Sequence, residues 1–151
     1  MQIPWVYPVR IAQAILGLIV LGLTAYVVDS FRDEWAFSDT VNFMLFLGCW
    51  TALIAVPYLA TASMWFRIAH HLVIPAIEII TMIFWFAGFI TMGAVLPPPR
   101  ACRWSTCRAL QATTVFGSFE WVLFAVTCYF SIIDLRNHGN TKQHSNAHLG
   151  V

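Results

Sequence analysis

Two carboxylic acids occur within stretches that are otherwise apolar. Glu120 lies in the middle of VFGSFEWVLFAV, residues 115–126, and Glu78 lies in IEIITMIFWFAGFI, residues 77–90. Carboxyl groups in apolar helices can carry protons or cations across a membrane, or they can join helices by hydrogen bonds, because an ionisable group in hydrocarbon is costly without a partner. The residue types therefore indicate either transport chemistry or polar packing inside a membrane.

The spacing of these acids from nearby polar side chains favours packing. Seven positions separate Glu78 from Trp85, and the same spacing separates Glu120 from Thr127. Residues seven apart share one face of a helix. If the two helices pair as an antiparallel hairpin with their ends level, Glu78 faces Thr127 and Trp85 faces Glu120. The threonine hydroxyl and the indole N–H can then hydrogen-bond to the acids, so we expect these four residues to form intramembrane polar packing with a structural role.

A small proton or cation transporter, channel or accessory subunit that uses Glu78 and Glu120 is the alternative. Transport proteins commonly place further charged residues or broken helices along the path. The sequence shows no Lys or Arg deep within an apolar stretch and no third acid that continues a relay. Structural packing is therefore the favoured interpretation, and conduction stays open as the second.

Two of the four cysteines lie close together in the polar stretch CRWSTC, residues 102–107. Cys102 and Cys107 suit a disulfide on an oxidising side of the membrane. A membrane thiol oxidoreductase that uses this pair is a less favoured alternative, because such enzymes relay electrons to a second cysteine pair or a quinone. No CxxC motif occurs, and Cys49 and Cys128 fall within separate apolar stretches. A structural disulfide between Cys102 and Cys107 is therefore predicted.

The histidines and the charge balance point to no further chemistry. His138, His144 and His148 are loosely spaced in a polar tail, and His70 and His71 are adjacent and so point apart on a helix. The net charge of +1 gives no basic field that would attract nucleic acid. We therefore expect no metal, no other cofactor, no nucleic-acid partner and no enzymatic activity.

The elements that position these residues follow from the composition. Of the 151 residues, 60% are hydrophobic and 10% are charged, a balance that indicates an integral membrane protein. Four apolar stretches reach the roughly 20 residues that a spanning helix needs, at about 10–28, 41–65, 72–96 and 110–133. Short links between them require antiparallel neighbours. The prediction is an all-α integral membrane protein, an antiparallel four-helix transmembrane bundle over residues 1–134, with a disordered cytoplasmic tail over 135–151.

The orientation of the bundle follows from the predicted disulfide. Basic residues near the helix ends are equally numerous on the two sides, so the positive-inside rule does not decide. A disulfide in the last loop places that loop outside the cytoplasm and both termini inside it. On the outer side, an acidic first loop can pair with a basic last loop. This predicted outer-loop charge pairing involves Asp29, Asp33, Glu34 and Asp39 with Arg100, Arg103 and Arg108.

The chain resembles the MARVEL-domain family of four-helix membrane proteins, particularly its fungal members. The resemblance is carried by the four-span plan, the cysteine-bearing last loop, the stretch 77–90, and the stretch CRALQATTVFGSFEWVLFAVT, residues 107–127. The resemblance extends from about Arg10 to Asp134. It implies cytoplasmic termini in a plasma membrane or in endomembrane vesicles. It also implies a non-enzymatic role in organising membrane domains, in vesicle trafficking or in membrane apposition. The implied partners are membrane lipids, with sterol as a candidate, and a second copy or another membrane protein.

Overall fold

Four helical rods make up the part of the chain that the computed structural model describes, which comprises residues 6–30, 38–59 and 72–148. The elements, in chain order, are α1 (Val6–Ser30), α2 (Ser38–Cys49), the π-helix η2 (Trp50–Ala55), α4 (Val73–Val95) and α5 (Ser105–His148). α2 and η2 together form the second rod, which remains helical to Leu59. All four rods are long and apolar enough to span a membrane. The predicted all-α, four-helix transmembrane fold is therefore confirmed.

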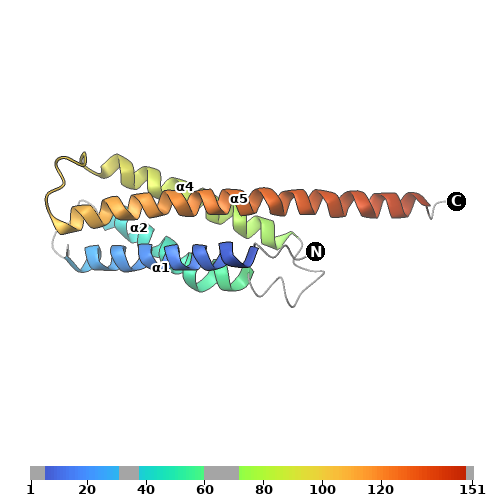
Figure 1. Cartoon of the computed structure of the whole chain (residues 1–151), viewed down its shortest axis with the longest axis horizontal. Coiled ribbons are helices and arrows are strands. Elements are labelled where there is room, and N and C mark those ends of the chain that lie inside the picture. The colour runs from blue at the N-terminus through green and yellow to red at the C-terminus, as the bar shows by residue number, and fades with distance from the viewer. Residues whose placement is uncertain (1–5, 31–37, 60–71, 149–151) are drawn as a thin grey trace.

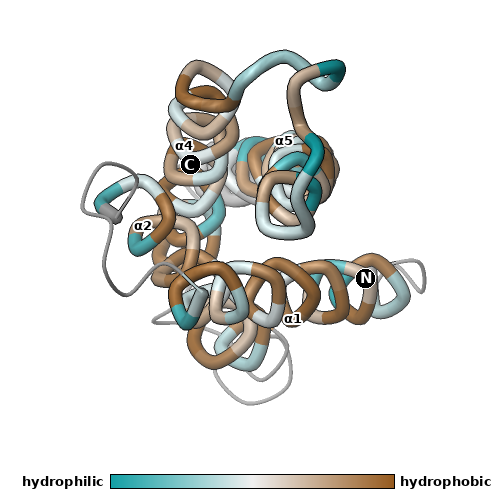
Figure 2. The backbone as a smooth tube through the Cα atoms, turned by 90° about the vertical axis from the view of Figure 1, so that its left-hand side faces the viewer, coloured by the Kyte–Doolittle hydropathy of each residue, from teal (hydrophilic) through white to brown (hydrophobic). Residues whose placement is uncertain are grey.

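The rods form a ring in which each packs against two others. α1 contacts α2 and α5, and α4 contacts α5 and α2, so α1 and α4 lie diagonally opposite each other. Figure 1 shows successive rods running in opposite directions, as the short links between them require. Figure 2 looks along the bundle and shows α1 crossing below α5 at an angle.

The buried side of each rod follows a spacing of three or four residues, which is the repeat of one helix face. On α1 the buried positions are 10, 13, 17, 20, 24 and 27, and on α5 they include 110, 113, 117, 120, 124 and 127. Large apolar side chains are exposed on the outer faces, among them Ile11, Leu18, Ile83 and Val115. Apolar side chains outside and polar ones inside are expected when the surroundings are hydrocarbon rather than water.

A widened turn interrupts the second rod just before Pro57. Proline has no N–H, and its ring clashes with the carbonyl four residues earlier, so a regular α-helix cannot pass through it unchanged. The N–H of Val56 donates to the carbonyl of Thr51, five residues back, which is the hydrogen-bond pattern of a π-turn. Residues 60–65, the end of the predicted second span, lie outside the part that the structure describes.

α5 extends beyond both of its predicted ends. It begins at Ser105 rather than near residue 110, and it continues past Asp134 to His148, so the prediction of a disordered tail is wrong for residues 135–148. Because the helix is already nucleated within the bundle, each added residue needs only the smaller free energy of propagation. At 1.5 Å per residue α5 is about 66 Å long, whereas a bilayer core is about 30 Å thick. Its C-terminal part projects beyond the other rods (Figure 1).

Candidate functional site

The interior of the bundle holds a set of polar side chains, which we call the polar seam. Its members are Arg10, Gln13, Thr51, Glu78, Thr81, Trp85, Glu120 and Thr127. They come from all four rods and are shielded almost completely, with exposed fractions of 8% for Arg10, 3% for Thr127 and 0% for the others. The four residues predicted to form intramembrane polar packing all lie in this seam.

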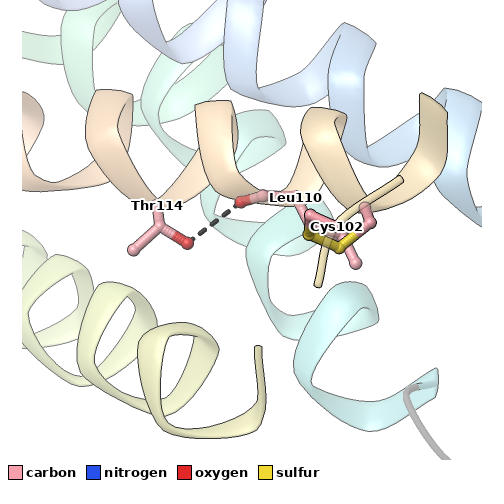
Figure 3. The surroundings of a disulfide bond; sticks show 4 residues. Cys102, Leu110 and Thr114 are labelled. Atoms are coloured by element: carbon pink, nitrogen blue, oxygen red, sulfur yellow. Dashed lines mark hydrogen bonds between the residues drawn. A yellow bond between two sulfur atoms is a disulfide. The ribbon is translucent and has the colours of Figure 1, made fainter. Parts of the chain in front are cut away.

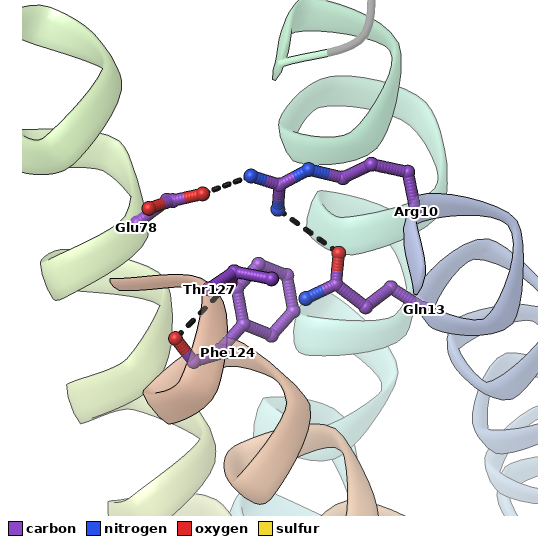
Figure 4. A network of polar contacts seen from close by, with 5 residues as sticks. All are labelled: Arg10, Gln13, Glu78, Phe124 and Thr127. Carbon is purple, nitrogen blue, oxygen red and sulfur yellow. Dashed lines mark hydrogen bonds and ion pairs between the residues drawn. The ribbon is translucent and has the colours of Figure 1, made fainter. Parts of the chain in front are cut away.

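One end of the polar seam is an ion pair between α1 and α4. Arg10 Nη2 pairs with Glu78 Oε1, and Arg10 Nη1 donates to Gln13 Oε1 at 3.0 Å (Figure 4). Hydrogen bonds between a guanidinium and a carboxylate are roughly twice as strong as those between neutral groups. Arg10 therefore supplies the charge that Glu78 needs inside the bundle, and it also fixes the carbonyl end of the Gln13 amide.

The prediction that Thr127 hydrogen-bonds to Glu78 is wrong. Thr127 Oγ1 donates to the carbonyl of Phe124 at 3.2 Å, a local bond that helix threonines readily make. The prediction compared the third and fourth spans alone, whereas Arg10 reaches Glu78 from the diagonally placed α1. Arg10 precedes the first long apolar run, so its position in the sequence indicates a basic group at the membrane surface and not an interior partner of Glu78.

Two tryptophans join the second rod to α4. Trp85 Nε1 donates to Thr51 Oγ1 at 3.0 Å, and Trp50 Nε1 donates to Thr81 Oγ1 at 3.1 Å. The prediction that Trp85 donates to Glu120 is therefore wrong, since the single N–H of the indole is directed to Thr51. Trp50 and Thr51 are adjacent in sequence, and both form hydrogen bonds with α4. Both residues lie in the widened turn of η2.

The predicted alignment of the third and fourth spans along each other is nevertheless close. A Cβ added to Gly117 would lie 3.5 Å from Cζ3 of Trp85 and 3.4 Å from Cβ of Phe89. Gly117 lies about one helical turn from Glu120, so Trp85 sits within roughly a turn of the level that the hairpin argument gives it. The acceptor for Trp85 nevertheless comes from the second rod and not from α5.

Glu120 lies at the other end of the polar seam. Its side chain is fully buried, and neither carboxylate oxygen has a hydrogen-bond partner among the groups that the structure describes. A Cβ added to Gly17 of α1 would lie 3.6 Å from Glu120 Oε1 and 3.2 Å from Cγ2 of Thr51. Because Gly17 has no side chain, the carboxyl fits between α1, α5 and the second rod.

The predicted disulfide between Cys102 and Cys107 is confirmed (Figure 3). It ties the last loop to the first turn of α5, and both cysteines are buried. Nearby, the Tyr26 hydroxyl of α1 lies 3.2 Å from Ser105 Oγ, at the first residue of α5. These two links fix the beginning of α5 to the loop and to the end of α1.

Three aromatic rings form a group on the outer side of α4 and α5, which we call the aromatic cluster. Its members are Phe86, Phe89 and Trp121. The ring centroids lie 5.7 Å apart for Phe86 and Phe89, 5.6 Å for Phe86 and Trp121, and 5.9 Å for Phe89 and Trp121. Rings at these separations attract one another beyond the burial of their area. Phe86 is 46% exposed, so the aromatic cluster presents an ordered apolar surface toward lipid.

The pairing of the acidic first loop with the basic last loop stays a prediction. Asp29, Asp39, Arg100, Arg103 and Arg108 are exposed, and Asp33 and Glu34 lie outside the part of the chain that the structure describes. Exposed ion pairs contribute little, typically about 0–1 kcal/mol each. Within residues 6–30, 38–59 and 72–148, no group of three His, Cys, Asp or Glu side chains is arranged to hold a metal ion.

Comparison with known proteins gives a family match over most of the chain. The sequence profile of the MARVEL family, described as a membrane-associating domain, matches residues 4–130. The matched region contains every residue of the polar seam and the disulfide. No curated protein and no solved structure matches the chain.

Proposed function

We propose, from the premise that the chain belongs to the MARVEL family, that it is a non-enzymatic tetraspan protein that organises membrane domains or takes part in vesicle trafficking or membrane apposition. It acts through contacts with lipids and with other membrane proteins. The family assignment supports association with membranes, and the four spans support a multi-pass integral protein. The proposed roles in membrane-domain organisation, trafficking and apposition depend on the contacts that the outer surface of the bundle can make.

The observation that carries the proposal is the contrast between that surface and the interior. In the most apolar window of each span, between 28% and 39% of the residues are buried, so most of each span faces lipid. Most members of the polar seam bond to one another or to their own helix, which fixes how the rods pack. The molecule therefore offers a large apolar surface on a bundle whose packing is specified from inside.

The aromatic cluster is the place on this surface where we expect a lipid preference. Phe86, Phe89 and Trp121 hold one another in place, so they lose little rotamer freedom when a lipid packs on them. A flat, rigid ring system such as that of a sterol makes more contacts with a fixed aromatic surface than a mobile acyl chain does. Sterol is therefore the proposed lipid partner at this cluster.

The experiment is partition in giant vesicles that separate into sterol-rich and sterol-poor phases. The purified protein carries a dye, and its density in the two phases is measured. Wild type is expected to concentrate in the sterol-rich phase, and the triple variant Phe86→Leu, Phe89→Leu, Trp121→Leu is expected to lose that preference. An even distribution of wild type, without clustering or bridging of vesicles, contradicts the proposal.

A matched control makes the same kind of change elsewhere on the lipid-facing surface. Phe46, Phe119 and Tyr129 are 47%, 54% and 62% exposed and lie outside the aromatic cluster. Their replacement by leucine also removes three aromatic side chains but leaves the aromatic cluster intact, so it should leave the partition of the protein unchanged. Loss of partition in both triple variants would show that general hydrophobicity, and not the cluster, sets the preference.

We further propose that both termini are cytoplasmic, in a plasma membrane or in endomembrane vesicles. The support is the Cys102–Cys107 disulfide, which lies at the end of the bundle opposite the C-terminal part of α5 and suits an oxidising compartment. An epitope added after Val151 should be reached by antibody only after cells are permeabilised. Labelling in intact cells would reverse the orientation.

A transporter or channel that uses Glu78 and Glu120 remains the second candidate, and buried Glu120 is the observation that favours it. Proton and cation flux into liposomes, with Glu120→Gln as the comparison, separates the two functions. Flux in wild type that Glu120→Gln abolishes, while the variant still folds, would replace the scaffold proposal. The thiol oxidoreductase alternative has less support, because Cys107 and the free Cys128 are separated by about 32 Å along α5.

A further inference from the structure

In the part of the chain that the structure describes, the interior of the bundle holds one positive charge fewer than it holds acids. Among the described residues, the buried charged side chains are Arg10, Glu78 and Glu120, one cation and two acids. Arg10 is committed to Glu78 and Gln13, so it leaves Glu120 without a counter-ion. An uncompensated carboxylate inside a protein is far too costly to persist, and the charge must be matched or removed.

We propose that Glu120 is a proton-binding site that exchanges its proton with water at the Arg10 end of the bundle and not at the other end. A proton is the cation that the surroundings can accept. The space beside Glu120 is bounded by Gly17 and Thr51, and Thr51 Oγ1 already accepts the indole N–H of Trp85. A metal cation would require several free oxygen ligands, which this contact set does not offer.

The route toward the Arg10 end is marked by further polar atoms that have unused hydrogen-bonding capacity. Gln13 lies one helical turn from Gly17, about 6 Å along α1, and its Nε2 has no hydrogen-bond partner among the described residues. Figure 4 shows this amide nitrogen directed from α1 into the interior, toward Phe124 and Thr127. Glu78 Oε2 is also without a partner in the described part of the chain, and Arg10 beyond it retains some exposure.

The interior on the other side of Glu120 is closed by apolar side chains. Val20, Val27, Met44, Leu47 and Met92 are all buried there. The two buried threonines in this half, Thr24 and Thr113, donate their hydroxyl protons to carbonyls of their own helices at 2.7 and 2.9 Å. Gln111 Nε2 on α5 is also buried without a partner in the described part of the chain, but it lies about 14 Å from Glu120 along the helix. Met44 packs between the two, since its Cε would lie 3.2 Å from a Cβ on Gly117. Within the described residues, the polar groups therefore lead from the Arg10 end to Glu120, and an apolar gap separates Glu120 from Gln111.

A proton site with one entrance binds and releases protons without moving them across the membrane. This behaviour distinguishes the inference from the transporter alternative, and it does not depend on the proposed membrane-organising function. Because Glu120 packs against the Gly17 backbone position, a change in its protonation acts directly on the contact between α1 and α5.

Infrared spectroscopy of the protein in lipid vesicles tests the site, because a protonated carboxyl has a carbonyl band distinct from that of a carboxylate. At neutral pH, wild type should show a protonated-carboxyl band that Glu120→Gln removes and Glu34→Gln retains. If Glu120→Gln does not fold, ¹³C-labelled glutamate in the Glu34→Gln background identifies the same band, since ion-paired Glu78 absorbs as a carboxylate. Absence of the band, or its loss when sodium or potassium is added at constant pH, overturns the proposal.

The route is tested by the rate at which the band shifts after transfer into D₂O. Because water crosses lipid membranes, D₂O added on one side of the vesicles soon reaches the other side. The path of exchange must therefore be identified by comparing variants. Gln13→Leu should slow the exchange by an order of magnitude, whereas Thr24→Val, on the closed side, should leave the rate at the wild-type value. Equal rates in wild type and Gln13→Leu, or slowing in Thr24→Val, would overturn the one-sided route. Circular dichroism and elution as a single species check that each variant folds.

Discussion

Arg10 of α1 and Glu78 of α4 form an ion pair across the bundle, although 68 positions separate them in the sequence. The two helices lie diagonally and do not share one of the main packing interfaces. The pair therefore links two elements that are otherwise held mainly through α5 and the second rod.

Breaking one side of this pair should cost more than replacing both sides. Arg10→Met leaves Glu78 buried without a cation, and the loss of a single partner from a buried pair typically costs about 3–5 kcal/mol. The double variant Arg10→Met, Glu78→Met leaves no uncompensated charge and should lose much less. Unfolding by SDS titration in mixed micelles measures both free energies. Exposed Arg136 provides the control, since Arg136→Met should change stability little, and equal losses in the single and double variants would contradict the prediction.

The partner of Trp85 can be identified by double-mutant cycles. Trp85→Phe and Thr51→Val both remove the bond at 3.0 Å, so their effects on the unfolding free energy should be coupled by roughly 0.6–1.7 kcal/mol, the average and the maximum found for interhelical bonds in membranes. Trp85→Phe combined with Glu120→Gln should show coupling near zero. Strong coupling in the second cycle would restore the pairing that the sequence predicts.

Two glycines on facing helices should respond oppositely to the same substitution. A Cβ on Gly48 would lie 3.0 Å from the N, Cα and Cβ atoms of Leu21, whereas a Cβ on Gly22 would meet nothing within 4 Å. Gly48→Ala must therefore push α1 and α2 apart and should destabilise the bundle by about 1–3 kcal/mol. Gly22→Ala should be neutral or stabilise by up to about 1 kcal/mol, because alanine favours helix. Unfolding measurements that rank the two variants in the reverse order would contradict this packing.

The spans and their packing faces were largely predictable from the sequence, because long apolar runs can only be helices in a bilayer. The alignment of Trp85 with the Gly117 turn of α5 also followed, since a short loop fixes an antiparallel hairpin. The disulfide followed from the placement of Cys102 and Cys107 in one polar loop. Each of these inferences depends only on residues of one segment or of two consecutive helices.

The hydrogen-bond partners were not predictable in this way, because they come from helices that are not consecutive. Arg10 reaches Glu78 from the diagonal helix, and Thr51 reaches Trp85 because a widened turn directs it there. One signal in the sequence could have found the first pair: Arg10, Gln13 and Gly17 follow a spacing of three and four, which places a basic residue and an amide on one face of the first span. The end of α5 was missed because polar composition does not prevent the continuation of a helix that is already nucleated.

The disulfide should stabilise the start of α5 rather than hold the bundle together. The bond spans five residues, and loop-closure entropy for so short a loop gives about 2 kcal/mol. The double variant Cys102→Ser, Cys107→Ser should therefore unfold with a free energy lower by about that amount while all four spans remain. The double variant Cys49→Ala, Cys128→Ala, which retains the disulfide, provides the reference. A gel shift with a maleimide polymer, with and without reductant, should show two additional reactive thiols only after reduction.

The C-terminal part of α5 should be dispensable for the stability of the bundle. It projects past the other rods (Figure 1), and a Cβ added to Gly139 would meet nothing within 4 Å. A chain that ends at Asn137 keeps the whole apolar window of the last span, so its unfolding free energy should stay within about 0.5 kcal/mol of the full chain, the range of surface changes. Circular dichroism should show the loss of the helical signal of residues 138–148. As a contrast, Gly139→Pro in the full chain should remove helical signal without changing the unfolding free energy, because proline disrupts a helix interior. A marked loss of stability in either variant would mean that this segment packs against the bundle or against a second copy.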